Sequence, residues 1–497
     1  MESLGTTFEF GAGGRKGPEA IIVPLVTTPK PPLSTISAVD ELCGGAVAEL
    51  FAAGAAPTDA GSVAHVVRSG PIKRIVVISL GAAEKVDAKA VRSAATTAAQ
   101  WIVDQKLSAA RLWIDGLASL ELDNAVGAWA LGMMLAGFRY ETYRKVDKPA
   151  PAKVRISVES ANTAQATRAI NLMKAEAPLA ESVNYARGLA HRPANELNPQ
   201  TLAAEARRLA KEDAKIKTTV LDAAQLKKLK MNGLLAVGQG ATHKACLIRM
   251  EYRGAPKSKR VTAIIGKAIT FDTGGYSIKQ TSGMWDMKFD KCGGMTVFGV
   301  MRAVARLKLP VNVIGLVPSA ENMISAEAYR PGDIIQMMNG KSVEIISADA
   351  EGRMILADTL TYAEQQCKPT EMIDLATLTG GVRIALGVYA AAVLGDNDDL
   401  CEELVECGRR TGERLWRLPV WDDYFDLIKG NDSDMRNSSL VRDAHCVVGG
   451  IFLKQFVTGS TPWAHLDIAG VATDDKKRQA TGFGVRLLVD YLRRRKA

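Results

Sequence analysis

The stretch SADAEGRMILAD, residues 347–358, is the feature that most constrains this chain. It places Asp349, Glu351 and Arg353 close together in sequence. Carboxylates that are packed closely repel each other unless positive charge lies between them. A fold that brings these side chains together therefore needs cations or basic side chains at the same place.

A second stretch upstream carries charged residues of the same kind. GKAITFDTGGYSIKQTSGMWDMKFD, residues 266–290, supplies Lys267, Asp272, Lys279 and Asp290. Two divalent metal ions would be the economical counter-charge if both stretches converge, because Asp and Glu can bridge two cations whereas His is usually a terminal ligand. The sequence therefore predicts a two-metal site.

Alternating apolar runs and helical patterns predict an α/β chain with two domains. We expect a smaller N-terminal α/β domain over 1–160, a linking helical segment over 161–190 and a larger C-terminal α/β domain over 191–497 with a central mixed sheet flanked by helices. In the first domain, apolar runs predict strands over 19–26, 74–80, 110–117 and 154–160, and helical patterns predict helices over 89–105 and 122–141.

The second domain shows the same alternation, and its predicted strands lead to the charged stretches. Strands are expected over 261–269, 311–320 and 343–349, and helices over 293–307 and 351–366. The first strand would carry Lys267 near its end, the loop after it Asp272, and the third strand would end at Asp349. Open α/β sheets place their sites at the carboxyl ends of strands, which agrees with the predicted chemistry.

Both charged stretches resemble the signature regions of the leucine aminopeptidase family, the hexameric two-metal exopeptidases of the cytosol. The family motif NTDAEGR appears here as SADAEGR, and the pattern GKGITFDSGG, a lysine and MKYD appears as GKAITFDTGG, Lys279 and MKFD. The likeness extends from about residue 180 to the C-terminus through VNYARGLAHRPANELNP, DLATLTGG and WAHLDIAG. Ser347, Ala348 and Lys291 depart from the family pattern.

The resemblance implies two metal sites that share ligands. One would be made by Lys267, Asp272, Asp290 and Glu351, and the other by Asp272, Asp349 and Glu351. Asp272 and Glu351 would then bridge the two ions. Zinc is the expected metal, with manganese, magnesium and cobalt as alternatives.

The resemblance also implies roles for the remaining charged residues and for a substrate pocket. Lys279 would polarise the scissile carbonyl, and Arg353 would hold a bicarbonate ion that relays a proton from the attacking water. The pocket for the first side chain of the substrate would be walled by Met287, Thr377, Gly380 and Ala469, with Leu378 as a backbone contact.

The function implied by the resemblance is that of a homohexameric, cytoplasmic aminopeptidase that releases N-terminal residues from peptides, preferably leucine and other large apolar residues. Two alternatives stay open. One is a family member that binds DNA and in which catalysis is secondary, and the other is a narrower dipeptidase, for example for cysteinylglycine.

Composition adds few constraints. The net charge of +9 would suit an anionic partner, yet only KKLK at 227–230 and RRRK at 493–496 are dense basic runs, so nucleic acid is not expected as a partner. No leader segment or apolar run of membrane-spanning length is found, so no membrane association is expected. Seven cysteines without a CxxC pair do not favour a disulfide framework or a zinc knuckle.

Overall fold

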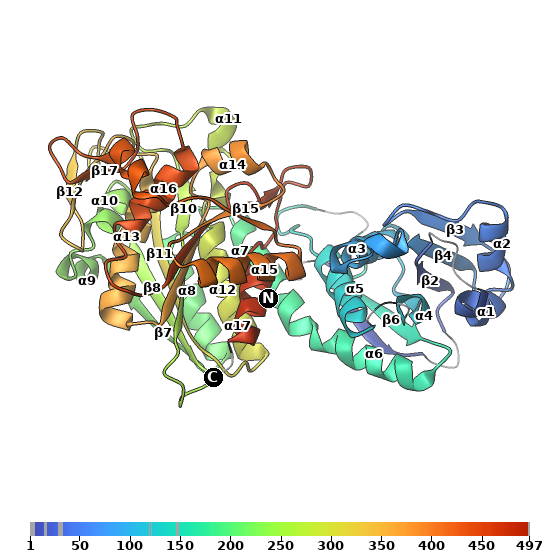
Figure 1. The fold of residues 1–497 in the computed structure, drawn as a ribbon. Coiled ribbons are helices and arrows are strands. Elements are labelled where there is room, and N and C mark those ends of the chain that lie inside the picture. Colours follow the sequence, from blue (N-terminus) through green and yellow to red (C-terminus); the bar gives the residue numbers. More distant parts are fainter. Residues whose placement is uncertain are drawn as a thin grey trace. The chain divides into compact units, whose positions relative to one another are not determined.

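The computed structural model describes residues 5–13, 17–27, 33–118, 120, 122–145 and 149–495. The chain forms two compact units, residues 1–184 and 185–497, and each is an α/β structure with its own sheet (Figure 1). The predicted class, a smaller N-terminal and a larger C-terminal α/β part with a mixed sheet in the latter, is confirmed. The domain boundaries predicted at 160 and 190 stay a prediction.

The first unit contains a six-stranded sheet in the order β1-β6-β5-β2-β4-β3, in which only the pairing of β3 with β4 is antiparallel. Its elements are β1 (Thr7–Ala12), β2 (Ala20–Leu25), α1 (Leu33–Leu42), α2 (Ala46–Ala52), β3 (Val63–Val67), β4 (Arg74–Ser79), η1 (Ala83–Lys85), α3 (Ala88–Asp104), β5 (Ala109–Trp113), α4 (Asp115–Ala118), α5 (Leu122–Ala136), β6 (Lys153–Glu159) and α6 (Thr163–Ala175), and the chain passes into the second unit within α7 (Ala177–His191).

All predicted strands and helices of this unit are present, but the strand predicted over 110–117 ends at Trp113 and is followed by helix α4. β2 is buried at every position, as a central parallel strand requires. Helix α3 begins where the side chain of Asp87 accepts a hydrogen bond from the backbone N–H of Ala90. The sequence did not predict β1, β3, α1 and α2. The helical pattern predicted after residue 160 is two helices, α6 and α7, which are separated at Glu176, two residues before Pro178.

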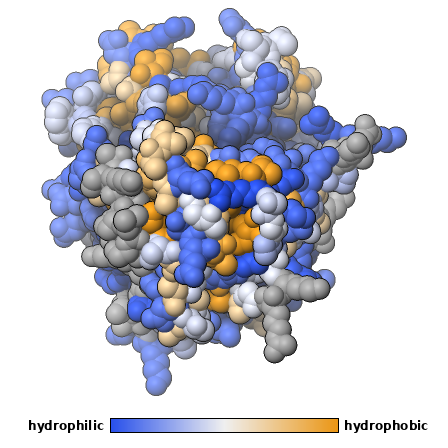
Figure 2. Space-filling view, turned by 90° about the vertical axis from the view of Figure 1, so that its right-hand side faces the viewer, coloured by the Kyte–Doolittle hydropathy of each residue, from blue (hydrophilic) through white to orange (hydrophobic). Residues whose placement is uncertain are grey.

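The surface that faces the viewer in Figure 2 is mostly hydrophilic, with hydrophobic side chains gathered near its centre. In the first unit, a groove of about 660 Å³ lies between α1, α6 and the carboxyl ends of β1, β5 and β6. Ala12, Trp113 and Glu159 contribute to its lining. None of the charged residues singled out in the sequence belongs to this groove.

The second unit contains a nine-stranded mixed sheet in the order β16-β15-β18-β14-β9-β11-β8-β7, with β10 paired to β11. Its elements are α8 (Pro199–Glu212), β7 (Ile216–Leu221), α9 (Ala223–Lys228), α10 (Asn232–Gly238), β8 (Cys246–Arg253), β9 (Thr262–Gly266), β10 (Ala268–Asp272), α11 (Thr281–Met284), η2 (Met287–Phe289), α12 (Cys292–Arg306), β11 (Asn312–Asn322), β12 (Ile334–Gln336), β13 (Ser342–Glu344), α13 (Glu351–Tyr362), η3 (Ala363–Cys367), β14 (Glu371–Ala376), α14 (Gly380–Leu386), β15 (Ala391–Leu394), α15 (Asp398–Thr411), β16 (Leu415–Arg417), η4 (Asp422–Ile428), β17 (Met435–Arg436), α16 (His445–Lys454), β18 (Trp463–Asp467), β19 (Thr473–Asp474), β20 (Gln479–Ala480) and α17 (Val485–Arg494).

The centre of this sheet is parallel, and helices pack against it. β9 pairs in parallel with both β11 and β14, and β14 pairs in parallel with β18. Ala263 and Ile265 of β9 alternate into a core shared with α10, α13 and α16, while α12 packs on β9, β11 and β14 and also contacts α17. The carboxyl ends of β9, β10, β14 and β18 therefore lie in one region.

Two predicted strands of this unit differ from the structure. The strand predicted over 261–269 is two strands, β9 and β10, which are separated by Lys267 alone, and Asp272 is the last residue of β10 rather than part of the loop after it. The strand predicted to end at Asp349 is wrong. Only Ser342–Glu344 form a strand, which belongs to a separate three-stranded sheet with β12 and β17.

The remaining predictions about the chain concern thiols and membranes. All seven cysteines lie within the described residues and are free thiols, and all except Cys367 are buried. In the part of the chain that the structure describes, no helix combines the length and apolar character that crossing a membrane requires.

Candidate metal centre

Lys267 occupies the break between β9 and β10, and its backbone is held by strand β14 and helix α12. Its N–H donates to the carbonyl of Leu375 over 3.1 Å, and its own carbonyl accepts from the N–H of Gly294 over 2.6 Å. A Cβ on Gly266 would stand 2.4 Å from the carbonyl oxygen of Gly293, so this close approach requires glycine. The side chain is thereby directed into the interior, where it is 3% exposed.

The ammonium of Lys267 lies among oxygen atoms from three segments. Its Nζ is 2.9 Å from Oδ1 of Asp290, 2.7 Å from Oε1 of Glu351 and 3.0 Å from the carbonyl oxygen of Thr377. Asp290 directly follows η2, and Oγ1 of Thr377 donates to its Oδ1 over 2.7 Å. Oδ2 of Asp290 is buried and has no hydrogen-bond partner among the described residues.

Glu351 is the first residue of helix α13 and is buried. A carboxylate is favoured at this position because the helix dipole places partial positive charge there. The next residue, Gly352, lies against Lys267, since a Cβ at 352 would stand 2.7 Å from Cε and Nζ of the lysine. The start of α13 therefore packs directly on Lys267.

Asp272 and Asp349 meet at a second lysine. Nζ of Lys279 is 2.9 Å from Oδ2 of Asp272 and 2.5 Å from Oδ1 of Asp349. Asp272 is buried, whereas the side chain of Asp349 is 34% exposed. Oδ1 of Asp272 accepts from the backbone N–H of Gly274 over 2.9 Å and from Nδ2 of Asn322 over 2.8 Å.

Three of the carboxylates form a group with the geometry of a metal site. Asp272, Asp290 and Glu351 each offer an oxygen atom, and these atoms lie within 4.8 Å of one another. With Asp349 there are four carboxylates against the ammonium groups of Lys267 and Lys279, which leaves an excess of negative charge when all four are ionised. The free Oδ2 of Asp290 and this excess both fit divalent cations, which prefer carboxylate oxygen ligands.

Burial and mutual repulsion perturb the acid–base properties of the cluster. Burial raises the pKa of Asp290 to about 8, and burial together with the nearby Glu351 and Asp272 raises the pKa of Asp349 to about 7. Burial alone would lower the pKa of Lys267, but Asp290 and Glu351 outweigh it and raise the pKa above its ordinary value. Strongly shifted carboxylates in one place are typical of a functional site.

Arg353 lies on the same helix as Glu351, two residues further along. It is almost fully buried, and burial lowers its pKa to about 10. One terminal nitrogen donates to the backbone carbonyl of Asn437 over 2.8 Å, whereas Nε has no hydrogen-bond partner among the described residues. The side chain therefore keeps an unused donor that an anion could satisfy.

The residues predicted to wall a substrate pocket come from three segments of the chain. Hydrogen bonds connect these segments to the cluster. Thr377 contacts both Asp290 and Lys267. The buried Asp467 accepts from the N–H of Leu378 and from the N–H of Ala469, each over 3.2 Å. Gly380 begins α14, where a Cβ would have no neighbour within 4 Å, and the carbonyl of Met287 accepts from the N–H of Asp290.

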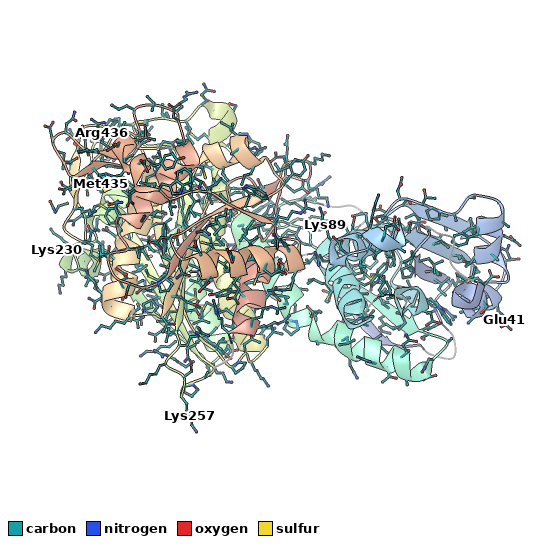
Figure 3. All side chains as sticks on the ribbon, viewed as in Figure 1. Glu41, Lys89, Lys230, Lys257, Met435 and Arg436 are labelled. Atoms are coloured by element: carbon teal, nitrogen blue, oxygen red, sulfur yellow. The ribbon has the colours of Figure 1, made fainter. Side chains whose placement is uncertain are left out.

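Sequence reasoning missed the uncharged residues that hold this cluster. Met435 and Arg436, labelled in Figure 3, form β17, and the next residue, Asn437, binds the segment before Asp349. Asn322 binds Asp272 from the end of β11. A single asparagine in a strand or loop does not contribute to the apolar periodicity from which strands and helices are predicted. Asn322 could still have been predicted as a site residue, because polar residues at strand ends line sites in α/β sheets.

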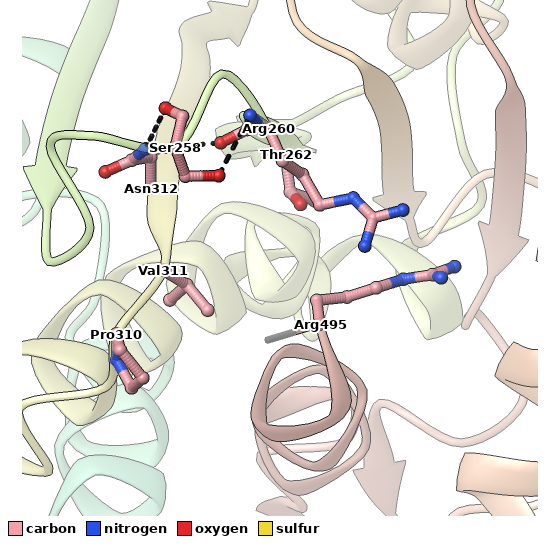
Figure 4. Close-up of a pocket in the computed structure, with 7 residues that line it drawn as sticks. All are labelled: Ser258, Arg260, Thr262, Pro310, Val311, Asn312 and Arg495. Atoms are coloured by element: carbon pink, nitrogen blue, oxygen red, sulfur yellow. Dashed lines mark hydrogen bonds between the residues drawn. The ribbon is translucent and has the colours of Figure 1, made fainter. Parts of the chain in front are cut away.

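Three other features of the second unit do not belong to the cluster. The small pocket in Figure 4, where Nδ2 of Asn312 donates to the carbonyls of Ser258 and Arg260, is at the amino ends of β9 and β11, opposite to the cluster. The side chain of Lys230, in the basic run KKLK, lies at the surface (Figure 3). His465 is fully buried, and its Nδ1 lies 2.5 Å from Oδ1 of Asp374, so it is a hydrogen-bonded core residue.

Comparisons with known proteins match both units of the chain to the same family. The catalytic domain of the cytosol aminopeptidase family matches residues 184–489, and the N-terminal domain of the same family matches residues 22–147. A probable cytosol aminopeptidase of Cenarchaeum symbiosum is 40% identical over 433 residues, which cover 86% of this chain and 87% of the relative. One of Geobacter sulfurreducens is 38% identical over 470 residues, covering 93% of each.

Two solved structures are similar to this chain over almost its whole length. A mutant of tomato leucine aminopeptidase has a TM-score of 0.85 at 30% identity, covering 98% of this chain and 96% of its own. The bottromycin maturation enzyme BotP in complex with Mn has a TM-score of 0.81 at 28% identity, covering 96% of this chain and 99% of its own.

Proposed function

The chain belongs to the cytosol aminopeptidase family. We propose how its own residues carry out the metal-dependent removal of N-terminal residues from peptides. The observation that carries the proposal is the buried group of Asp272, Asp290 and Glu351, with Lys267 and Lys279 on either side.

We propose that these residues hold two divalent ions. Lys267, Asp272, Asp290 and Glu351 would hold one ion, and Asp272, Asp349 and Glu351 the other. When bound, such ions supply a Lewis acid for the scissile carbonyl and lower the pKa of water. Zinc is the proposed metal. Manganese, magnesium and cobalt are alternatives, and the Mn complex of BotP supports considering manganese first among them.

The side chains around the proposed ions would bind the substrate and move protons. Lys279 can leave Asp349, which is partly exposed, and place its ammonium at the carbonyl oxygen of the scissile bond, where negative charge develops. Arg353 would hold a bicarbonate ion through its unused Nε and thereby position a proton acceptor near the attacking water.

The segments joined by Asp467 would form the pocket for the first side chain of the substrate. Met287, Thr377, Leu378, Gly380 and Ala469 offer mostly uncharged surface, which supports leucine and other large apolar residues as preferred substrates. We further propose that the enzyme is cytoplasmic and assembles as a homohexamer, as the resemblance implied.

The experiment compares a leucyl peptide with its N-acetyl form. In the proposed function the free α-amine would be a ligand of a bound metal ion, and acetylation removes the lone pair that this requires. We expect the free peptide to be cleaved, the acetylated peptide to be inert and a chelator to stop cleavage. Equal rates for both peptides would contradict the proposal. Cysteinylglycine assayed in parallel tests the narrower dipeptidase, which would cleave it much faster than leucyl peptides.

A further inference from the structure

Asn322 lies beside Asp272 because of strand register. It is the last residue of β11, and in the parallel pairing of β10 with β11 it stands directly opposite Asp272. Partners in such a pair direct their side chains to the same face of the sheet. Asn322 is fully buried and carries no charge, so its contribution at this place comes from its hydrogen bonds alone.

The side chain of Asn322 donates to two segments of the candidate metal centre. Nδ2 lies 2.8 Å from Oδ1 of Asp272 and 3.0 Å from the carbonyl oxygen of Ala348. Both atoms accept hydrogen bonds, so the amide must present its NH2 group to them, and the opposite orientation would set oxygen against oxygen. Oδ1 of Asn322 is buried without a hydrogen-bond partner among the described residues.

These bonds determine which oxygen of Asp272 faces the centre. Oδ1 is taken by two N–H donors, Nδ2 of Asn322 and the backbone of Gly274. Oδ2 is directed toward Lys279 over 2.9 Å. The carbonyl of Asn322 also accepts from the N–H of Thr273 over 3.0 Å and from its Oγ1 over 2.8 Å, so the backbone after Asp272 is fixed from the same residue.

We propose that Asn322 is a positioning residue of the metal centre, which sets the affinity for divalent ions by fixing the carboxylate of Asp272 and its distance from the segment that carries Asp349. The inference rests on the proposed function, in which Asp272 would help to hold both ions. In this role the uncharged Asn322 binds Oδ1 of Asp272 and thereby keeps Oδ2 directed at the centre.

Removal of the Asn322 side chain leaves both of its acceptors with another partner. Oδ1 of Asp272 keeps the N–H of Gly274, and the carbonyl of Ala348 keeps the hydroxyl of Tyr329 at 2.7 Å. Since no buried acceptor is left without a donor, the Asn322→Ala chain should fold. What it loses is the direct connection between the two segments.

Asn437 provides a matched control on the other side of the same loop. Its Oδ1 accepts from the N–H groups of Ile346 and Ser347 over 2.8 and 3.2 Å, and its Nδ2 donates to the carbonyl of Ser347 over 2.7 Å. Among the described residues, none of these side-chain bonds reaches the side chain of a proposed ligand. Asn437→Ala removes more hydrogen bonds from the loop than Asn322→Ala does, but it leaves Asp272 as it is.

The test measures Mn²⁺ binding to the purified full-length chain by the loss of the free-ion EPR signal, together with thermal unfolding of the chelator-treated protein. Asn322→Ala should weaken Mn²⁺ binding by about 10-fold to 100-fold, the usual effect of losing a partner of a metal ligand. Its unfolding midpoint should fall less than that of Asn437→Ala. Asn437→Ala should weaken Mn²⁺ binding less than Asn322→Ala does.

Two results would overturn the inference. One is unchanged Mn²⁺ affinity in Asn322→Ala, and the other is an equal or larger loss of affinity in Asn437→Ala, which would indicate that both residues only stabilise the loop. If Asn322→Ala does not fold, Asn322→Ser, which keeps one donor, must bind Mn²⁺ measurably more weakly than the unaltered chain, and equal affinity would overturn the inference. Failure of the unaltered chain to bind Mn²⁺ would instead contradict the proposed metal centre itself.

Discussion

The ammonium of Lys267 and the carboxylate of Glu351 lie 2.7 Å apart in the interior, although the two residues are far apart in the sequence. Gly352 makes this approach possible, because any side chain at 352 would collide with the end of Lys267. The lysine, the glutamate and the glycine after it therefore form one packed unit, and a change in any of them should reach the metal centre.

Gly352→Ala should lower the metal content of the purified protein and its peptidase activity. The added Cβ would stand 2.7 Å from Nζ of Lys267 and push the lysine away from Asp290 and Glu351. Metal analysis and circular dichroism check this. Gly283→Ala is the control, since a Cβ there meets nothing within 4 Å, and it should change neither quantity. Normal metal content in Gly352→Ala would contradict the packing argument.

Glu351→Ala should abolish turnover and metal retention. It removes the carboxylate that Lys267 contacts and that the proposed bridging role requires, and it leaves Asp290 and Lys267 as a buried pair. Metal analysis after dialysis measures the effect, and Asp286→Ala, which removes a carboxylate that is not a proposed ligand, is the control. Full occupancy in Glu351→Ala would exclude a bridging role for this residue.

Lys279→Met should retain metal while losing roughly 10²-fold or more in kcat, the scale of one donor to a developing oxyanion. Lys279 contacts Asp272 and Asp349 but is itself only partly buried, so its loss does not open the interior. Steady-state kinetics with metal analysis on the same sample separate the two effects. Loss of metal in this variant would indicate that Lys279 holds the site together rather than acting on the substrate.

Stability should fall with acid through His191. Burial, then Lys288, Arg187 and Lys291, lower its pKa to about 3 from its usual 6.5, so the folded chain favours the neutral ring, whose Nε2 accepts from the N–H of Ala480. This contribution is complete above pH 6.5 and is lost as the pH falls toward 3.

The slope from this one group approaches about 1.4 kcal/mol per pH unit between those limits. Urea unfolding at several pH values measures it. His191→Gln keeps an acceptor for Ala480 without the titrating ring, so its unfolding free energy should fall less steeply than that of the unaltered chain. Parallel slopes for the two proteins would show that His191 does not ionise on unfolding.

The sequence allowed the charged cluster and most of the long strands and helices to be predicted. Clustered charged residues and periodically spaced apolar residues both leave recognisable patterns in a sequence. The two charged stretches suggested one shared centre, and the family resemblance implied that Lys267, Asp272, Asp290 and Glu351 meet there. These side chains do lie together in the fold. Their roles as ligands stay a prediction.

The failures have specific physical causes. The run VEIISAD alternates like a strand, but the N–H groups of Ile346 and Ser347 bind the side chain of Asn437 instead of a neighbouring strand. The break at Lys267 depends on the approach of Gly293 to Gly266, which periodicity cannot reveal. Asn322 reaches Asp272 across 50 positions through strand register, and an uncharged amide gives no sign of such a partner.

The two lysine ammonium groups also bear on how a newly made chain matures. Each links a pair of carboxylates from different segments, Lys267 joining Asp290 to Glu351 and Lys279 joining Asp272 to Asp349. The segments can therefore assemble during synthesis with positive charge that the chain itself provides. If the proposed ions bind there, Lys267 would have to give up a proton, and Lys279 would have to give up its contacts with Asp272 and Asp349. In the proposed function, the chain would therefore fold before it binds metal and would stay inactive until the ions displace these lysine contacts.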